Sequence, residues 1–270
     1  MAKTEPVSQR RLITGFSNPT VKFLRSLRDK KHRKAAGKFL AEGLRLLTDA
    51  RECGRLPELL VMAKGRDEHP LLAAGGEVIE TEEDILGKIT GKDNPQAVAG
   101  VFAEFDTSLA GLDRSAAPIW LVAQAMRDPG NLGTMLRTCD AVGAGGLILL
   151  DDCADPFSVE AVRASMGAVF TQAIARARWD EFIAWLRGGP GQLVAASLRE
   201  AVPYRGAPYA APCFLMVGNE SRGLPEDYER ACDLRVTMPM RGRADSLNAA
   251  IAGAVLAYEA LAALVPEASA

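Results

Sequence analysis

Short apolar runs, each followed by a segment with apolar residues at helical spacing, repeat along most of this chain. The clearest example is the apolar run at 119–124, which a tight turn separates from a segment with one apolar side. The residues on that side are Leu132, Met135, Leu136, Cys139 and Val142. Repeated alternation of this kind predicts an α/β fold, with a mostly parallel sheet covered by helices on both faces.

The predicted elements fall into two groups. The first contains basic and apolar helices at 17–31, 43–53 and 82–89, strands at 39–40, 58–62, 77–80 and 97–105, and a weak helix between 62 and 77. The second contains strands at 119–124, 147–150, 169–175 and 193–196, helices after 131 and at 158–164, 179–187 and 246–264, and apolar runs within 214–225 and 233–251. Residues 107–117 contain few large apolar groups and precede Pro118, so we interpret them as a linker between domains 1–106 and 118–270.

The last predicted helix has one side formed by Leu247, Ile251, Ala254, Val255, Tyr258 and Leu261. Eight of its nineteen residues are alanine, which permits close packing of helices. This composition is consistent with a subunit interface. A helix packed against its own sheet has the same pattern.

The charge is distributed unevenly, although the net charge is only −2. Residues 1–38 contain eleven Lys or Arg against two acids, giving +9, and the remainder of the chain carries −11. A basic leading segment on an acidic body indicates a polyanionic partner. A solvated charged helix is the alternative.

The composition narrows the possible chemistry. Five cysteines occur without a C-x-x-C pair and there are only two histidines, so neither a zinc site nor a disulfide framework is expected. The start lacks the apolar segment of a signal peptide, and no apolar run is long enough to span a bilayer. We expect a cytoplasmic protein with no membrane association.

Several common active-site motifs are missing. No G-x-G-x-x-G follows a predicted strand and there is no P-loop, which argues against a Rossmann dinucleotide site. Neither histidine has a setting that would activate a serine or cysteine. Three polar loops remain, at 127–137, 218–223 and 238–248. They follow predicted strands, where open α/β sheets bind their ligands.

These loops resemble the motifs of the SpoU or TrmH class of RNA ribose 2′-O-methyltransferases, in the SPOUT superfamily. The first is Asp-Pro-Gly-Asn-Leu-Gly-Thr-Met-Leu-Arg-Thr at 128–138, where the family more often begins with Asn. The second is Val-Gly-Asn-Glu-Ser-Arg-Gly-Leu at 217–224, and the third joins Met-Pro-Met at 238–240 to Asp-Ser-Leu-Asn-Ala at 245–249. The resemblance covers roughly 118–264.

The first domain is more loosely similar to the substrate-binding module of the family, a small ribosomal-protein-like α/β fold. Phe-Leu-Ala-Glu-Gly at 39–43 is the clearest part of that similarity. Arg163, Ser165 and Gly167 resemble a further family segment near the pocket. A helix end and a turn would explain them equally well.

The resemblance implies a deep trefoil knot at the carboxyl end, an exception to the rule that chains do not thread loops. It also implies bound S-adenosylmethionine, a homodimer formed through the knotted domain, and RNA as the partner, with no role in DNA binding. The implied cofactor contacts are Gly218, Met238 and Leu247, with Asn219, Pro239 and Asn248 shaping the loops. Glycine at 218 would let a backbone edge approach the ligand closely.

Arg137 is the principal catalytic candidate implied by the family, either as a base or as a clamp on phosphate and the developing oxyanion. We favour the clamp, because arginine is effectively always protonated. Asn131 would orient the hydroxyl or Arg137, Glu220 would orient Arg137 or its loop, and Ser246 would hold the phosphate or the nucleophile. Asn248 is the fifth catalytic candidate.

Each of these residues also has a simpler interpretation. Asn131 is suited to cap a helix, as is Ser246. Arg137 is compatible with a solvated helix face, and Glu220 with an ordinary loop position.

The resemblance therefore implies an S-adenosylmethionine-dependent RNA 2′-O-methyltransferase. The two-domain layout, by resemblance, favours ribosomal RNA as its substrate, and a transfer RNA 2′-O-methyltransferase is an alternative. A ribosome-assembly factor with the same fold and no catalysis is one alternative. Retention of all five candidate catalytic residues weighs against it. Methylation of a base nitrogen is another alternative, and the Ser-Leu-Asn motif disfavours it.

Overall fold

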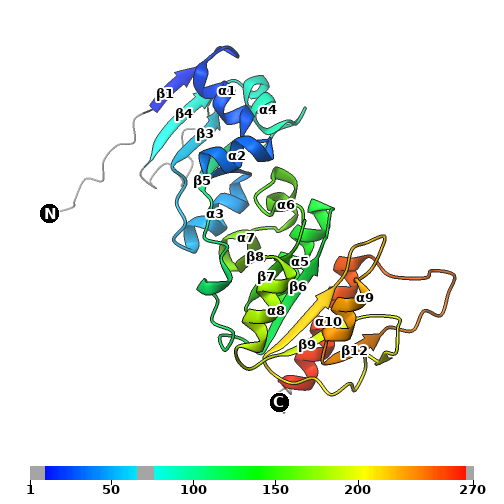
Figure 1. The fold of residues 1–270 in the computed structure, drawn as a ribbon. Coiled ribbons are helices and arrows are strands. Elements are labelled where there is room, and N and C mark those ends of the chain that lie inside the picture. The colour runs from blue at the N-terminus through cyan, green and yellow to red at the C-terminus, as the bar shows by residue number, and fades with distance from the viewer. Residues whose placement is uncertain (1–9, 66–75, 266–270) are drawn as a thin grey trace, which may run out of the picture. The chain divides into compact units, whose positions relative to one another are not determined.

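The computed structural model describes residues 10–65 and 76–265 (Figure 1). The described residues form two compact units. The N-terminal unit contains the described residues up to Phe105 together with Asp155–Thr171, and the C-terminal unit contains Asp106–Ala154 and the described residues from Gln172 onward. Most of the predicted weak helix falls on 66–75, outside the described residues.

A five-stranded sheet forms the centre of the N-terminal unit. Its order is β1 (Arg10–Ile13), β4 (Glu77–Thr81), β3 (Leu59–Ala63), β5 (Val98–Ala103) and β2 (Lys38–Glu42). Strands β1, β4 and β3 are parallel, and β5 runs antiparallel to both β3 and β2. The sequence patterns predicted all of these strands except β1.

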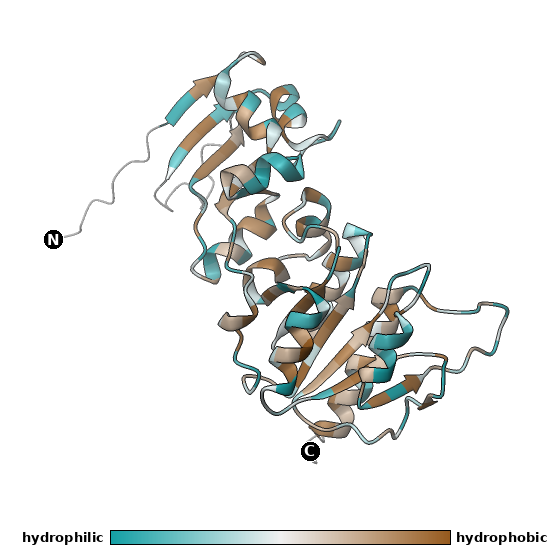
Figure 2. Ribbon diagram, viewed as in Figure 1, coloured by the Kyte–Doolittle hydropathy of each residue, from teal (hydrophilic) through white to brown (hydrophobic). Residues whose placement is uncertain are grey.

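The basic segment forms two helices, α1 (Pro19–Ser26) and α2 (Lys30–Ala36), which are joined by a sharp turn. The prediction of a single helix at 17–31 was therefore wrong. The reason is Asp29, whose carboxylate caps α2 by accepting a hydrogen bond of 2.8 Å from the amide of Lys31. Helix α2 is strongly hydrophilic (Figure 2).

The N-terminal sheet is covered on both faces. On one face, α1 and α4 (Glu83–Thr90) pack their apolar residues against Leu40, Val61 and Ile79. On the other face lie α3 (Leu44–Glu52) and α7 (Ala168–Thr171), while α6 (Val159–Ala164) contacts β2. The rings that pack together around Phe39 are those of Phe102, Phe105, Phe157 and Phe170.

Asp155–Thr171 packs with the N-terminal unit, although the sequence analysis assigned it to the second domain. The predicted strand at 169–175 was also wrong, because residues 168–171 form α7 and the strand, β8, covers Ala173–Ala177. Phe170 explains the difference, because its side chain is buried and its ring centroid lies 4.8 Å from that of Phe102. Tertiary packing thus overrides the strand propensity of Val169, Phe170 and Thr171.

Arg33 does not belong to the exposed basic surface. Its side chain is 3% exposed and forms an ion pair of 2.8 Å with Asp155, whose side chain is 6% exposed. The same guanidinium donates hydrogen bonds to the carbonyl oxygens of Leu27 and Arg28 at 2.9 and 2.7 Å. One charge that the sequence analysis attributed to polyanion binding is therefore structural.

The C-terminal unit is built on a seven-stranded sheet in which every strand pair is parallel. Its order is β10 (Val202–Pro203), β12 (Leu234–Thr237), β9 (Gln192–Ala196), β11 (Cys213–Val217), β6 (Ile119–Gln124), β7 (Gly146–Leu150) and β8. Strand β10 is not among the strands predicted from the sequence.

Helices cover both faces of this sheet and produce three layers (Figure 1). Helices α5 (Pro129–Val142) and α10 (Ala249–Leu264) contact each other and β6 on one face. Apolar residues of α8 (Trp179–Arg187) and α9 (Glu226–Ala231) pack with Trp120 and Phe214 on the other face. The α/β class with a mostly parallel sheet is confirmed.

Helix α10 packs through a face different from the one the sequence suggested. Its buried residues are small ones such as Ala250, Gly253 and Ala257, together with Leu256. Ile251 and Tyr258 are 49% and 55% exposed. The alanines therefore pack against α5 and the sheet of the same chain, as the second explanation has it, and the larger apolar residues are left exposed.

The predicted linker packs on the C-terminal unit. It contains a short 3₁₀ helix at Leu109–Gly111, and Leu109 is only 3% exposed. The guanidinium of Arg114 donates hydrogen bonds to the carbonyl oxygens of Trp185 and Leu186 at the end of α8, at 2.7 and 3.0 Å. Across residues 10–65 and 76–265, no helix has both the length and the apolarity needed to cross a bilayer.

Candidate active site

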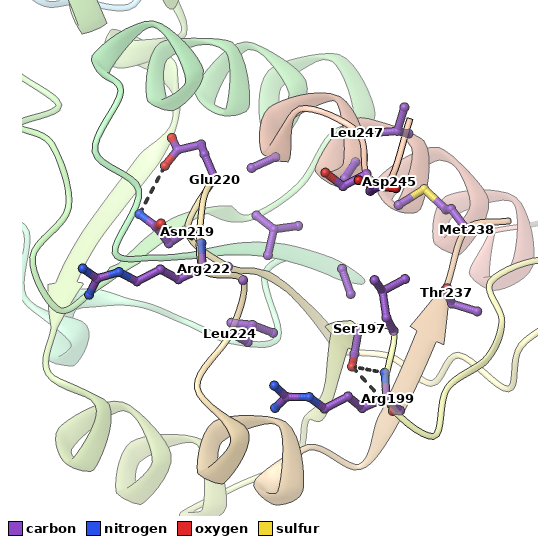
Figure 3. Close-up of a pocket in the computed structure, with 18 of the residues that line it drawn as sticks. Ser197, Arg199, Asn219, Glu220, Arg222, Leu224, Thr237, Met238, Asp245 and Leu247 are labelled. Atoms are coloured by element: carbon purple, nitrogen blue, oxygen red, sulfur yellow. Dashed lines mark hydrogen bonds between the residues drawn. The ribbon is translucent and has the colours of Figure 1, made fainter. Parts of the chain in front are cut away.

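The loops that follow β9, β11 and β12 enclose a cavity of about 330 Å³ at the carboxyl ends of these strands. This volume lies within the range of ~300–1,000 Å³ that is typical of small-molecule sites. Figure 3 shows the side chains that line it, which belong to the loops after all three strands and to the approach to α10. The cavity is therefore where strand order predicts a ligand in an open parallel sheet.

The loop after β11 is tightly folded around Asn219. Its side-chain amide donates to the carbonyl oxygen of Ala125 at 2.8 Å, and its side-chain oxygen accepts from the amides of Ser221 and Arg222 at 3.0 and 3.1 Å. The amide of Gly223 closes the turn by donating to the backbone oxygen of Asn219 at 2.9 Å. Asn219 thus fixes the loop shape and attaches it to the end of β6.

Gly218 is needed for a reason that the sequence analysis did not identify. A Cβ atom at this position would lie 2.5 Å from the amide nitrogen of Leu224, and it would also collide with the backbone of Gly223. The protein's own loop thus leaves no room for a side chain here. The close approach of a ligand to the backbone, which the sequence analysis expected from this glycine, would be a second advantage.

Asn131 occupies the first turn of α5. Asp128 caps that helix by accepting a hydrogen bond of 2.7 Å from the amide of Asn131, so the interpretation of Asn131 as the cap was wrong. Its side chain is consequently available for other contacts. The side-chain amide of Asn131 donates to Glu220 Oε1 at 3.1 Å, and its side-chain oxygen accepts from Asn248 Nδ2 at 2.8 Å.

Asn248, Asn131 and Glu220 therefore form a continuous hydrogen-bond chain that joins all three motifs. Asn248 is the N-cap of α10, where its side-chain oxygen accepts from the amides of Ala250 and Ile251. Ser246, which was a candidate cap, does not have that role. A chain of this kind fixes which way each amide points, because every donor meets an acceptor.

Glu220 is held ionised by its surroundings. Partial burial alone would raise the pKa of Glu220, but its own backbone amide, the Asn131 side chain and the amides of Arg127 and Asp128 outweigh burial and lower it. The carboxylate lies 3.4 Å from each of the last two amides. Glu220 is therefore an anion that organises the loop before α5.

The residues of the third motif lie in the cavity lining or next to it. Met238, Ser246 and Leu247 line the cavity, whereas Pro239 is exposed beside it and is not in the lining. Leu247 is 39% exposed. The lining carboxylates are Glu220, Glu229 and Asp245.

Arg137 is not in the lining of this cavity. It lies on α5 six residues after Asn131, a rise of about 9 Å along the helix. The side chain is exposed and makes no hydrogen bond or ion pair with the described residues. Arg163, Ser165 and Gly167 belong to the N-terminal unit and do not contribute to the cavity either.

The sequence analysis missed the part of the cavity wall that follows β9. Ser197 and Arg199 line the cavity, and Arg199 forms an ion pair of 3.2 Å with Glu229 of α9, whose side chain is only 7% exposed. The available signal was position, since residues 197–199 directly follow the predicted strand at 193–196. Among the described residues, no group of three or more His, Cys, Asp or Glu is arranged to hold a metal ion.

Comparison with known proteins agrees with this geometry. Residues 118–258 match the SpoU rRNA Methylase family, and residues 18–100 match the MRM3-like substrate binding domain. The chain is 32% identical to the 23S rRNA (guanosine(2553)-2′-O)-methyltransferase RlmP of Bacillus subtilis, over 91% of this chain and 97% of that protein.

Solved structures give the same result. An AdoMet-bound rRNA methyltransferase from Sinorhizobium meliloti has a TM-score of 0.89 and 41% identity, covering 95% of this chain and 99% of that one. The AdoMet complex of the SpoU methyltransferase AviRb from Streptomyces viridochromogenes has a TM-score of 0.82 and 28% identity, covering 90% and 97%. The chain belongs to the SpoU rRNA methylase family.

Proposed function

We propose that this protein transfers a methyl group from S-adenosylmethionine to a ribose 2′-hydroxyl of ribosomal RNA. The observation that carries the proposal is the hydrogen-bond chain of Asn248, Asn131 and Glu220, which ties the three motifs together beside a cavity of cofactor size. Relatives across most of the chain are named as rRNA 2′-O-methyltransferases, which supports the same activity. The alternative without catalysis has no structural observation in its favour.

The cavity fits S-adenosylmethionine. Two of its lining carboxylates, Glu220 and Asp245, form no ion pair with a described residue, whereas Glu229 is already paired with Arg199. These two carboxylates suit a ligand with a positively charged sulfur and an ammonium group. We assign direct contacts to Gly218, Met238 and Leu247, with Asn219, Pro239 and Asn248 shaping the loops. When bound, this cofactor supplies an activated methyl group.

The chain's own residues would prepare the hydroxyl. A neutral hydroxyl is a poor nucleophile, so catalysis requires alignment and stabilisation of the charge that develops on its oxygen. Arg137 has an uncommitted guanidinium that can clamp the phosphate and the developing oxyanion. Ser246 faces the cavity and can hold the nucleophile. Asn131 and Glu220 are positioning residues, because both are fixed by the hydrogen-bond chain.

We also propose the trefoil knot and the homodimer of the family for this chain. The loops after β11 and β12 line one cavity, and α10 packs on α5 beside them, an arrangement that supports a knotted carboxyl end. Ile251 and Tyr258 leave an apolar strip of α10 exposed, which supports pairing through the C-terminal unit. A cytoplasmic location is consistent with the rRNA substrate.

RNA binding is assigned to the N-terminal unit. Helices α1 and α2 present exposed cations and the exposed ring of Phe23, which is 39% exposed. Cations neutralise phosphates, and aromatic rings stack on unpaired bases. The exposed cations of this surface are Lys22, Arg25, Arg28, Lys30, Lys31 and Lys34.

A map of 2′-O-methyl groups in rRNA tests the proposed activity. In a strain that lacks this protein, at least one methylated ribose is expected to disappear and to return when the wild-type chain is restored. Calorimetric titration of the purified protein with S-adenosylmethionine is the companion measurement. Cofactor binding without any change in the methylation map would contradict the enzyme and favour the non-catalytic factor. If the strain instead lost a methyl group on a base nitrogen, the protein would be assigned base methylation in place of ribose methylation.

Gly218→Ala is expected to weaken S-adenosylmethionine binding at least about fivefold. The new Cβ overpacks the loop against Leu224, and overpacking of this kind costs about 1–3 kcal/mol. Calorimetry measures the affinity. Gly242→Ala is the matched control, because nothing lies within 4 Å of a Cβ at that position. Equal affinities for the two variants would show that the turn tolerates a side chain.

The lowered pKa of Glu220 predicts a pH-dependent contribution to stability. Because its pKa is lower in the folded state than the ordinary value of about 4.3, the contribution is complete above that value and is lost as the pH falls through the folded pKa. The urea midpoint of the wild-type protein should exceed that of Glu220→Gln from pH 7 to about pH 5, and the difference should shrink at lower pH. A constant difference down to acid pH would exclude this cause.

A further inference from the structure

A second cavity, of about 500 Å³, lies within the N-terminal unit. Part of its lining comes from two segments that the sequence analysis selected and that the methyl-transfer site does not use. Glu42 and Gly43 belong to the Phe-Leu-Ala-Glu-Gly segment, and Arg163 and Met166 belong to the segment that contains Ser165 and Gly167. Residues about 120 positions apart in the chain thus converge on one hollow.

Two arginines face this cavity without a partner. Arg45 and Arg163 both line it and are exposed, and neither makes a hydrogen bond or an ion pair with the residues that the structure describes. The third cation is Lys92, which is already neutralised by Glu42 at 2.9 Å. Asp49 is the other carboxylate of the lining, so the cavity keeps a net positive charge.

The start of α3 opens into the same space. Gly43 precedes this nine-residue helix with a φ of 112°, and no side chain caps the first turn. Gly43, Leu44, Arg45 and Leu46 all line the cavity. Uncapped amides at a helix start attract anions, above all phosphate. Arginine adds to this preference, because its planar fork pairs with two phosphate oxygens at once.

An apolar surface adjoins these donors. Leu44 and Met166 are 46% and 49% exposed and both line the cavity. Met166 has a φ of +50°, a conformation that is strained for a residue with a side chain and that concentrates at functional sites. Gly167 follows with a φ of 100°, and a Cβ there would lie 2.9 Å from Asp49 Oδ2. The backbone therefore holds Met166 at the cavity against its own preference.

We propose that this cavity binds one unpaired nucleotide of the RNA substrate, with the phosphate at Arg45, Arg163 and the start of α3. The base lies against Leu44 and Met166. Recognition of RNA commonly uses splayed-out bases stacked on aromatic rings or arginine planes. Pockets for an extruded base also use apolar side chains. The identity of the RNA rests on the proposed function, whereas the site itself rests on the cavity.

Salt-dependent binding of protein-free rRNA tests the site. Arg45→Ala and Arg163→Ala should each weaken binding about tenfold, as expected for loss of a charge-assisted hydrogen bond. Each should also reduce the slope of log affinity against log salt by about 0.7, the value for one phosphate contact on a single strand. Affinity for S-adenosylmethionine should not change. Lys88→Ala, which removes an exposed cation of α4 outside the cavity, is the control. It should change the rRNA affinity and the salt slope by less than either arginine variant does.

A photoreactive benzoyl-phenylalanine distinguishes the possible occupants. Placed at Leu44 it should crosslink to rRNA, whereas at Leu56, which is 50% exposed and outside the cavity, it should not. Uridine monophosphate at millimolar concentration should compete only weakly. Strong competition would assign the cavity to a free nucleotide, and crosslinking to protein in ribosomal particles would assign it to a protein partner. Either result overturns the proposal.

The two proposals can fail separately. Wild-type protein that binds rRNA through Arg45 and Arg163 but methylates nothing would preserve the nucleotide site and remove the proposed activity. Methylation that proceeds with unchanged rRNA affinity and an unchanged salt slope in both arginine variants would preserve the activity and remove the site. The melting temperature of each variant verifies that it is folded. Both arginines are exposed and unpartnered, so we expect no change in it.

Discussion

Arg137→Ala is expected to slow methyl transfer to rRNA by at least about 10²-fold, the loss typical of removing one donor to a developing oxyanion. Affinity for S-adenosylmethionine should stay within about twofold, because Arg137 does not line the cofactor cavity. The exposed guanidinium makes no hydrogen bond or ion pair with the described residues, so we expect its removal to leave the fold unchanged. Single-turnover transfer to rRNA and calorimetric titration with the cofactor measure the two quantities.

Arg178→Ala supplies the control for this experiment. Arg178 is an exposed arginine of the same unit that lies outside the cofactor cavity, and its removal should leave transfer unchanged. If Arg137→Ala weakened cofactor binding as strongly as transfer, Arg137 would belong to the cofactor site. If transfer were unaffected, Arg137 would be the solvated helix residue that its exposure alone suggests.

Arg137→Lys separates the two roles considered for this residue. A clamp needs positive charge and benefits from the planar fork, so lysine should retain part of the activity. A base needs to lose its proton, and lysine does so more readily than arginine. In that case the lysine variant should match or exceed the wild type as the pH rises. A rate that falls at every pH in the lysine variant would support the clamp.

The sequence predicted the position of the cavity beside the loops after β11 and β12, because the determinants of that position are local. Each of the three motifs follows a strand of the C-terminal sheet, and the carboxyl ends of parallel strands share one edge. Spacing therefore brings Glu220 and Ser246 to the same region before any contact is known. The hydrogen-bond partners within the site could not be predicted in this way, because the hydrogen bond between Asn131 and Asn248 joins residues 117 positions apart. No local pattern specifies that pairing.

Charge and apolar patterns were less reliable where tertiary contacts decide the outcome. Arg33 is indistinguishable in sequence from its exposed neighbour Lys34, yet it is buried against a carboxylate 122 residues away. Phe170 lies in a run that favours a strand, yet its ring packs in the aromatic cluster of the N-terminal unit. The alanines of α10 determine its packing, because small residues allow close approach of helix and sheet, so the larger apolar side is left exposed.

Arg33→Ala is expected to destabilise the N-terminal unit by about 3–5 kcal/mol, the usual cost of breaking a buried ion pair. The substitution removes the guanidinium that neutralises Asp155 at 2.8 Å, and it also removes the donor to the carbonyl oxygens of Leu27 and Arg28. Hydrogen exchange of the amides in β2 and α3 reports on this unit. All three tryptophans, at 120, 179 and 185, lie in the C-terminal unit, so their fluorescence reports separately on that unit.

Two further variants identify the cause of that loss. Lys34→Ala removes an exposed cation of the same helix and should change stability by less than about 0.5 kcal/mol. Replacing both partners, as Arg33→Met with Asp155→Leu, should recover most of the lost stability, because the cost of leaving one charge buried disappears when both charges are removed. A double variant as unstable as Arg33→Ala would instead assign the stability to the hydrogen bonds at Leu27, Arg28 and Phe157, which both substitutions together remove. Protection in β2 and α3 that stayed at the wild-type level in Arg33→Ala would show that the ion pair does not hold the Asp155–Thr171 segment in the N-terminal unit.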